Sequence, residues 1–182
     1  MAFINKILFF LFLVMLSLSS CEEGKVIPKK VQDTLNMSDM PDQIGWNTQV
    51  NFVDSSFTKA ILKAKRARIY QKRNETLLDG GLYVEFLSKT TGRRISHLTA
   101  DSARIDDLTK NMLAAGHVIV ISDSNQTKLE TSLLHWNNKT QLFYSTEFVK
   151  ITSPKERIQG YGFESDQNLS NYKVFKVSGE QR

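Results

Sequence analysis

From Trp46 onward, apolar and polar residues alternate in short segments that are separated by turn residues. The segments are rich in Val, Ile, Thr, Tyr and Phe, which favour strands, and a period of two indicates one buried face. Turn-forming residues punctuate them at Asp79-Gly80-Gly81, Thr91-Gly92, Asp123-Ser124-Asn125, Asn137-Asn138 and Ser153-Pro154. The pattern predicts an all-β domain.

Two segments leave a helical alternative open. Phe57 to Tyr70 and Ser102 to Ala115 contain many Ala, Lys, Leu and Arg residues, which favour helices. Helix propensity is a weak guide, and neighbouring strands can override it.

An internal repeat predicts how the strands are arranged. Four short elements at 67–69, 103–105, 134–136 and 162–164 each precede a turn and a valine-centred strand, at 82–86, 118–121, 148–151 and 174–177. The interval is 31 residues both from Ala103 to Leu134 and from Val118 to Val149. Repeats of this kind stack hairpins on one another, and the ends of such a stack present unpaired backbone groups.

The N-terminus has the features of a bacterial lipoprotein signal. Lys6 supplies a positive charge, residues 7–18 form an apolar run, and Leu18-Ser19-Ser20-Cys21 is a lipobox. We expect residues 1–20 to be a signal peptide and Cys21 to carry acyl chains on its thiol and its amine, because stable anchoring takes more than one chain. The alternative is an uncleaved anchor helix, although serines interrupt the run and a bilayer takes roughly 20 apolar residues.

The mature chain divides into a tether and one domain. Residues 21–44 are polar and contain Pro28, Pro41 and Lys29-Lys30, which is typical of a linker, and residues 45–182 form the predicted β domain. The chain has one cysteine, so the fold depends on apolar burial and hydrogen bonds.

Charge and motifs favour binding over catalysis. The net charge of +5 suits a neighbour of anionic lipid, and we expect no nucleic acid partner for the basic cluster 63–68 outside the cytoplasm. His97, His117 and His135 lack zinc-site spacing, and neither a Gly-x-Ser-x-Gly motif nor a free thiol is present. We predict no catalytic residue, metal or cofactor.

Two short motifs have structural interpretations. Gly160-Tyr-Gly162 is too short for a phosphate loop, and we expect a turn at a strand edge that needs positive φ. Asp106-Asp107 is expected to cap a turn.

Longer motifs resemble a known family. Residues 92–103 (GRRISHLTADSA), 115–118 (AGHV), 129–136 (LETSLLHW), 148–151 (FVKI), 158–166 (IQGYGFESD) and 177–179 (VSG) follow one another in the order and spacing of the LptC family of lipopolysaccharide-export proteins. The resemblance covers roughly Trp46 to Gly179. It departs at the anchor, since many family members have a transmembrane helix where this chain has a lipobox.

The resemblance implies an open β-jelly-roll of stacked antiparallel hairpins, similar to LptA, in which two sheets meet along one side. It implies a protein that takes lipopolysaccharide from an inner-membrane ATP-binding-cassette transporter and passes it to an LptA-like bridge protein. Acyl chains need a dry trough, which one face of alternating strands can line. The expected lipid-binding residues are Ile69, Val84, Phe86, Val118, Val120, Leu134, Trp136, Val149, Ile151, Phe163 and Val174.

The strands near Gln49 to Val53 and Tyr172 to Val177 are expected to pair with partners, the C-terminal one with the bridge protein. The anchored protein would lie in the periplasm of a Gram-negative bacterium, and the inner membrane is favoured over the outer. Two alternatives stay open: a scaffold with closed sheets that binds partners without lipid, and a surface lipoprotein outside the export pathway.

Overall fold

The computed structural model describes residues 40–181, which form strands joined mostly by tight turns. A short 3-10 turn, η2 (Gln71–Arg73), joins the second strand to the third. None of the described residues form a helix that is long and apolar enough to cross a membrane. The strands are β1 (Gln43–Asp54), β2 (Phe57–Tyr70), β3 (Glu75–Leu87), β4 (Arg94–Ala100), β5 (Ser102–Asp106), β6 (Met112–Ser122), β7 (Lys128–Asn137), β8 (Leu142–Thr152), β9 (Arg157–Asp166) and β10 (Tyr172–Gln181).

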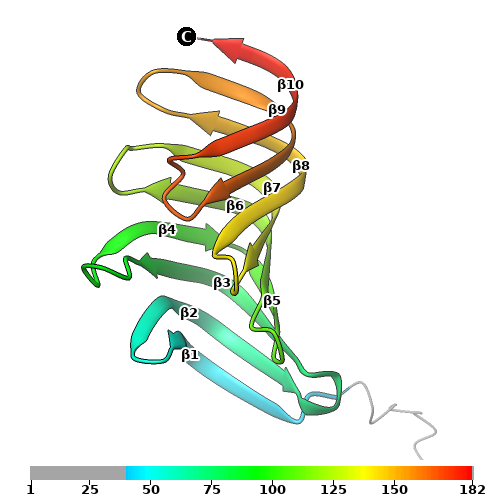
Figure 1. Cartoon of the computed structure of the whole chain (residues 1–182). Coiled ribbons are helices and arrows are strands. Elements are labelled where there is room, and N and C mark those ends of the chain that lie inside the picture. Colours follow the sequence, from blue (N-terminus) through cyan, green and yellow to red (C-terminus); the bar gives the residue numbers. More distant parts are fainter. Residues whose placement is uncertain (1–39, 182) are drawn as a thin grey trace, which may run out of the picture. The chain divides into compact units, whose positions relative to one another are not determined.

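The strands form one antiparallel sheet in the order β1-β2-β3-β4-β6-β7-β8-β9-β10. β5 pairs with β3 and β6, so β4 and β5 together fill one position in the sheet. Successive hairpins therefore stack from β1 to β10 (Figure 1). The all-β prediction and the stacked hairpins are confirmed, and β1 begins two residues before the expected start of the domain.

Neither segment with helical propensity is a helix: Phe57 to Tyr70 is β2, and Ser102 to Ala115 contains β5, a turn and the start of β6. In β2, Leu62 and Ala64 are buried, whereas Lys63 between them and Lys65 beyond them are exposed. A period of two fits a strand with one buried face and does not fit a helix. Burial of the alternate residues therefore overrides the helix propensity of Ala and Lys.

Each long strand bends where the pairing register is interrupted. The interruptions lie at residues 47 and 65, at Gly80-Gly81, at Asp101, and at residues 116–117, 132–134, 146–147 and 162. They are neighbours across the sheet, since Gly81 N donates to Asp101 O and Asp101 N donates to Gly116 O. Bulges bend strands, and we call this row of bulges the crease.

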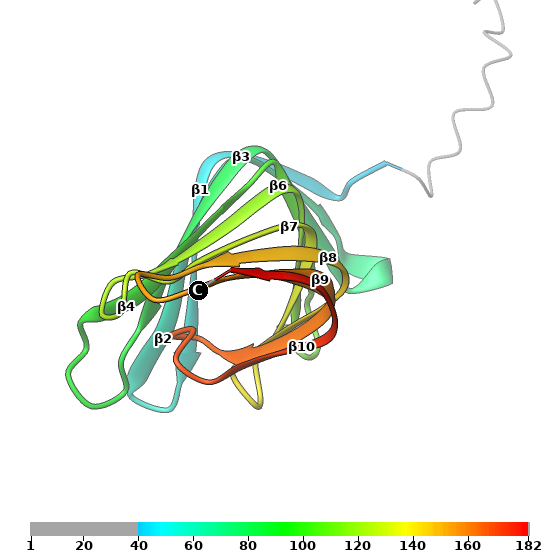
Figure 2. The same ribbon diagram turned by 90° about the horizontal axis from the view of Figure 1, so that it is seen from above.

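The crease folds the sheet into two facing halves (Figure 2). Half A contains 48–64, 82–100, 118–131, 148–161 and 176–181, and half B contains 43–46, 66–79, 102–115, 133–145 and 163–174. The chain crosses the crease twice per hairpin, which explains the repeat of 31 residues. The resemblance implied two sheets that meet along one side. Here the strands form a single sheet that is folded along the crease.

The inner faces of the halves form the core. Small residues flank the crease, with Ala64 and Ala67 in β2 and Ala100 and Ala103 at the junction of β4 and β5, all of them buried. Gly116 has φ 76°, and a Cβ there would collide with the side chain of Asp101. Small side chains at the crease let the two halves meet at a narrow angle, and larger side chains fill the space farther out.

Candidate functional site

The predicted lining residues lie on the inner faces of both halves. Nine of them are at most 1% exposed: Val84, Phe86, Val118, Val120, Leu134, Trp136, Val149, Ile151 and Phe163. The other two, Ile69 and Val174, are partly buried. The structure therefore brings the predicted residues together on one continuous, mainly apolar surface.

Four aromatic rings fill the space between the halves. Trp136 of half B makes edge contacts with Phe52 and Phe86 of half A, at centroid distances of 5.0 and 5.5 Å. Phe86 also packs edge-on against Phe143, at 5.0 Å. Phe52 and Phe143 are absent from the predicted lining. Apolar neighbours hide their inward direction in the sequence, since Val53 follows Phe52, and Leu142 and Tyr144 flank Phe143. In this structure the interior is occupied by its own side chains.

The rim opposite the crease is closed by hydrogen bonds between the two halves. We call this rim the mouth. Lys59 Nζ donates to Asn138 O at 3.1 Å, and Ser96 Oγ donates to Gln167 O at 2.5 Å. These pairs join residues 79 and 71 positions apart.

The loop between β9 and β10 supplies much of this closure. Asn168 Oδ1 accepts hydrogen bonds from Ser122 Oγ and Ser124 Oγ, both at 3.0 Å. Asn125 Nδ2 donates to the carbonyls of Asn168 and Leu169, at 3.2 and 3.3 Å. Leu169 is 1% exposed, so the loop is pinned by an apolar anchor as well as by polar contacts.

Tyr172 adds a further contact across the mouth. Its hydroxyl donates to Glu156 Oε1 at 2.5 Å. Burial, together with the hydrogen bond and negative charge of Glu156, raises the pKa of Tyr172 to about 12. The phenol therefore stays protonated, and stays a donor, throughout the physiological range.

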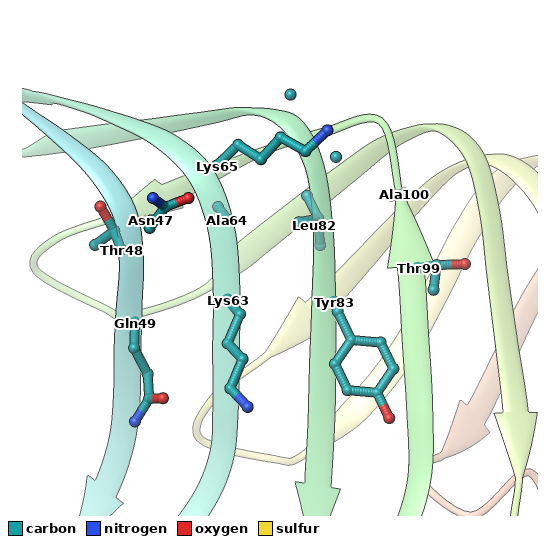
Figure 3. A pocket seen from close by; sticks show the side chains of 12 residues that line it. Asn47, Thr48, Gln49, Lys63, Ala64, Lys65, Leu82, Tyr83, Thr99 and Ala100 are labelled. Carbon is teal, nitrogen blue, oxygen red and sulfur yellow. The ribbon is translucent and has the colours of Figure 1, made fainter.

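A pocket of about 620 Å³ lies beside the crease among β1 to β4. Lys63, Lys65 and Tyr83 line it together with Gly80 and Gly81. Figure 3 shows that the side chains of Lys63 and Lys65 diverge along the crease. Their ammonium groups do not converge on one point, so the geometry does not form a two-lysine anion site.

Part of the basic cluster 63–68 forms ion pairs with an acidic residue on β3. Asp79 Oδ1 lies 2.6 Å from Arg66 Nε, and Asp79 Oδ2 lies 3.0 Å from an amino group of Arg68. The hydrogen bond from Arg66 lowers the pKa of Asp79, and the charges of both arginines add to this effect. Asp79 therefore pairs with two of the four basic residues and offsets one of their charges.

The three histidines have separate structural partners. His97 Nδ1 lies 3.3 Å from Asp123, and His117 Nδ1 lies 2.7 Å from Asp101 at the crease. His135 stacks on Tyr144 at 4.4 Å, and burial lowers its pKa, with a contribution from Arg104. The structure does not bring the three histidines together.

Comparison with known proteins places this geometry in a family. A family model described as lipopolysaccharide-assembly, LptC-related, matches residues 7–177. The chain belongs to the LptC-related family. The LptC resemblance found in the sequence is thereby confirmed, and membership assigns the chain to lipopolysaccharide transport in the Gram-negative envelope. Among curated protein sequences, no significant match is found.

A solved structure shares the fold of this LptC-related chain. LptH from Pseudomonas aeruginosa, described as the LptA-homologous periplasmic component of the lipopolysaccharide transport device, superposes with a TM-score of 0.51 and 13% identity. The match covers 66% of this chain and 84% of that one. The similarity confirms the predicted β-jelly-roll.

The two edges of the LptC-related sheet lie where the sequence predicted them. Gln49 to Val53 is in β1 and Tyr172 to Val177 is in β10, and neither strand has a second neighbour among the described residues. Val53 and Val177 are 60% and 54% exposed. Exposed edges of this kind can accept a further strand.

Two sequence interpretations in the LptC-related chain have clear outcomes. Asp106 Oδ1 accepts hydrogen bonds from the amides of Leu108 and Thr109, so the predicted turn cap is confirmed. The turn predicted at Gly160-Tyr-Gly162 is wrong, because both glycines lie within β9. Gly162 has φ 75° at the crease, and Gly160 is needed because β10 passes where its Cβ would lie.

The predicted signal peptide, the acylated Cys21 and the tether up to residue 39 lie outside the described residues.

Proposed function

We propose that this LptC-related protein is a non-enzymatic conduit that binds lipopolysaccharide by its acyl chains between the two halves of the creased sheet. One observation carries the proposal: the buried inner face is mainly apolar along the whole stack, from Phe52 on β1 to Phe163 on β9. A face of this length can follow several acyl chains, each held by dispersion and by exclusion of water.

Lipid entry requires the mouth to open. The four aromatic rings occupy the space that acyl chains would take, so the halves must separate or the rings must change rotamers. The mouth is held by individual hydrogen bonds, whereas at the crease the chain itself runs from one half into the other. Opening is therefore expected at the mouth, with the crease as the hinge.

The ends of the stack would serve for transfer. On β10, Val177 pairs with Gly160 and so shares its inward direction, yet Val177 is 54% exposed. The apolar inner face thus continues to the open end. We propose that β10 adds to the edge of an LptA-like bridge protein and that the β1 end receives lipopolysaccharide from the inner-membrane transporter.

The same proposal includes the anchor. Acylated Cys21 would hold the protein in the periplasm at the inner membrane, and residues 21–44 would set the distance of the sheet from the bilayer.

A scaffold is the second candidate, because the packed aromatic cluster favours it. Edge contacts at 5.0 to 5.5 Å among Phe52, Phe86, Trp136 and Phe143 are those of an ordinary core. A scaffold would use β1 and β10 to join its neighbours while the interior stayed closed.

The two tryptophans provide a test. Trp136 is 1% exposed in the interior, and Trp46 is 68% exposed. Full-length protein in detergent is titrated with lipid A that carries brominated acyl chains, which quench a tryptophan on contact. The W46F variant reports Trp136 alone, and the difference between wild type and W46F reports Trp46.

A conduit predicts saturable quenching of Trp136 with Trp46 much less affected. Quenching of Trp46 alone would indicate adsorption to the outer surface. Unquenched Trp136 at saturating lipid would favour the scaffold and overturn the conduit.

A further inference from the structure

Most buried polar side chains on the inner faces have partners. Ser96 Oγ donates to Gln167 O, and Ser145 Oγ donates to Leu133 O at 2.7 Å. Thr131 Oγ1 donates to Phe148 O at 2.9 Å. Buried polar groups in native proteins are nearly always paired in this way, and each exception needs an explanation.

Three buried polar atoms on half B are exceptions. Trp136 Nε1, Ser165 Oγ and Gln167 Nε2 have no hydrogen-bond partner within residues 40–181, and their residues are 1%, 2% and 5% exposed. The remaining unpaired atoms of this kind belong to Arg68 and Asp79, which face each other in an ion pair.

The three atoms lie in one region of the inner face. Trp136 pairs with Phe143, and Phe143 pairs with Ser165, so Trp136 and Ser165 occupy the same level on β7 and β9. Gln167 follows Ser165 by two residues and reaches the mouth, where its carbonyl accepts from Ser96. Neighbouring strands lie about 4.8 Å apart, and β8 lies between β7 and β9. The backbones at Trp136 and Ser165 are therefore separated by roughly 10 Å.

We propose that Trp136, Ser165 and Gln167 form a polar subsite that hydrogen-bonds acceptor oxygens of a bound acylated lipid. This inference rests on the proposed function. An indole N–H and an amide NH₂ only donate, so their partners must be acceptors, and a serine hydroxyl can donate as well. Ester and amide carbonyls at the heads of separate acyl chains supply such acceptors inside an otherwise apolar environment.

The subsite would fix how deeply the lipid enters the interior. Apolar contacts alone let an acyl chain slide, whereas fixed donors near the mouth hold the carbonyls at one depth. The headgroup would then stay outside the mouth, while the chains run toward the crease.

Two buried serines on neighbouring strands give a matched pair of variants. The hydroxyl of Ser165 is unpaired. Ser145 lies on β8, two residues after Phe143, which is the pairing partner of Ser165, and its hydroxyl donates to Leu133 O. Removing an unpaired buried hydroxyl costs the free protein little, whereas removing a paired one leaves an orphaned acceptor. We therefore expect S165A to keep or raise the thermal midpoint of the full-length protein and S145A to lower it.

Lipid A binding should respond in the opposite sense. Full-length variants in detergent are titrated with lipid A, and we expect S165A to weaken affinity roughly three- to tenfold, which corresponds to one hydrogen bond. S145A should change lipid A affinity less than S165A does, because the Ser145 hydroxyl already has a partner in the free protein. In ¹⁵N-labelled W46F, the single indole N–H resonance of Trp136 should move downfield as lipid A is added.

Three outcomes would overturn the subsite. S165A could bind lipid A as tightly as wild type, the Trp136 indole resonance could stay in place while lipid binds, or S165A could lose as much stability as S145A. Each of these leaves the conduit intact, because wild-type binding is measured in the same series. Failure of wild type to bind lipid A would remove the conduit and the subsite together.

Discussion

Loosening the β9–β10 loop should speed lipid entry. The perturbation is N168A, which deletes the side-chain oxygen that accepts from Ser122 Oγ and Ser124 Oγ. The backbone carbonyl of Asn168 still accepts from Asn125, and Leu169 stays buried, so the loop keeps its course. The variant therefore weakens the closure of the mouth without removing it.

N168A also removes the hydrogen bond from Asn168 Nδ2 to Ser170 Oγ at 2.8 Å, which lies within the loop. The size of the effect on closure follows from the two lost hydrogen bonds that cross the mouth. Each intramolecular hydrogen bond contributes about 1 kcal/mol net, so N168A should reduce the free energy that holds the mouth closed by about 2 kcal/mol. That change raises the population of open molecules about 30-fold. If opening precedes binding, the association rate rises by a similar factor.

The assay is stopped-flow association of fluorescent lipid A with the full-length protein in detergent. The matched control is N137A. Asn137 Oδ1 also accepts two hydrogen bonds, from the amides of Lys139 and Thr140, but both lie within one turn and neither crosses the mouth. Both variants should lose unfolding free energy, whereas only N168A should bind lipid faster.

An N168A variant that is less stable than wild type yet associates at the wild-type rate would refute gating at this loop. Equal acceleration by N137A would also refute it, because the effect would then follow general stability.

Three further variants test the fold and the closure. F86A removes a fully buried ring from the aromatic cluster and should cost about 3–5 kcal/mol in urea unfolding; a loss below 1 kcal/mol would contradict the packing. The pKa of Tyr172 is about 12 in the folded protein and about 10 in the unfolded chain, so its contribution to the free energy of unfolding is complete below pH 10 and is lost as the pH rises toward 12. Wild type should therefore lose more stability than Y172F between about pH 10 and 12. G160A places a Cβ on the carbonyl of Lys176 and should destabilise by roughly 1–3 kcal/mol, with faster amide exchange in β10, and unchanged exchange would count against the close approach.

Local periodicity in the sequence was enough to predict strands and most inward positions. Val84 and Phe86 alternate with Tyr83 and Glu85, and both are fully buried as that pattern predicts. Residues 118–121 are apolar on both faces, so alternation left their direction open. Pairing decides it: Val120 lies opposite Leu98, and both point into the core.

The repeat interval was visible in the sequence, but its cause was not. The sequence indicated separate short strands, whereas the structure has long strands that each cross the crease. The bulge at Lys65 shifts the alternation by one residue, and the bulge at Gly116-His117 interrupts it, which makes one strand resemble two.

The closure of the mouth could not be predicted from local patterns. The contact between Ser96 and Gln167 joins residues 71 positions apart, and no local pattern in the sequence pairs them. The same holds for Trp136 and Ser165, whose unpaired atoms become evident only when every neighbouring donor and acceptor is placed. The positions of such groups follow from the tertiary fold.

Photo-crosslinking in living cells tests most directly whether lipid lies between the halves. A photoreactive amino acid is placed at Val149, which is fully buried and points inward, or at the next residue on β8, Lys150, which is exposed on the outer face. The conduit predicts lipopolysaccharide adducts at 149 and far fewer at 150. Adducts at 150 with none at 149 would contradict it.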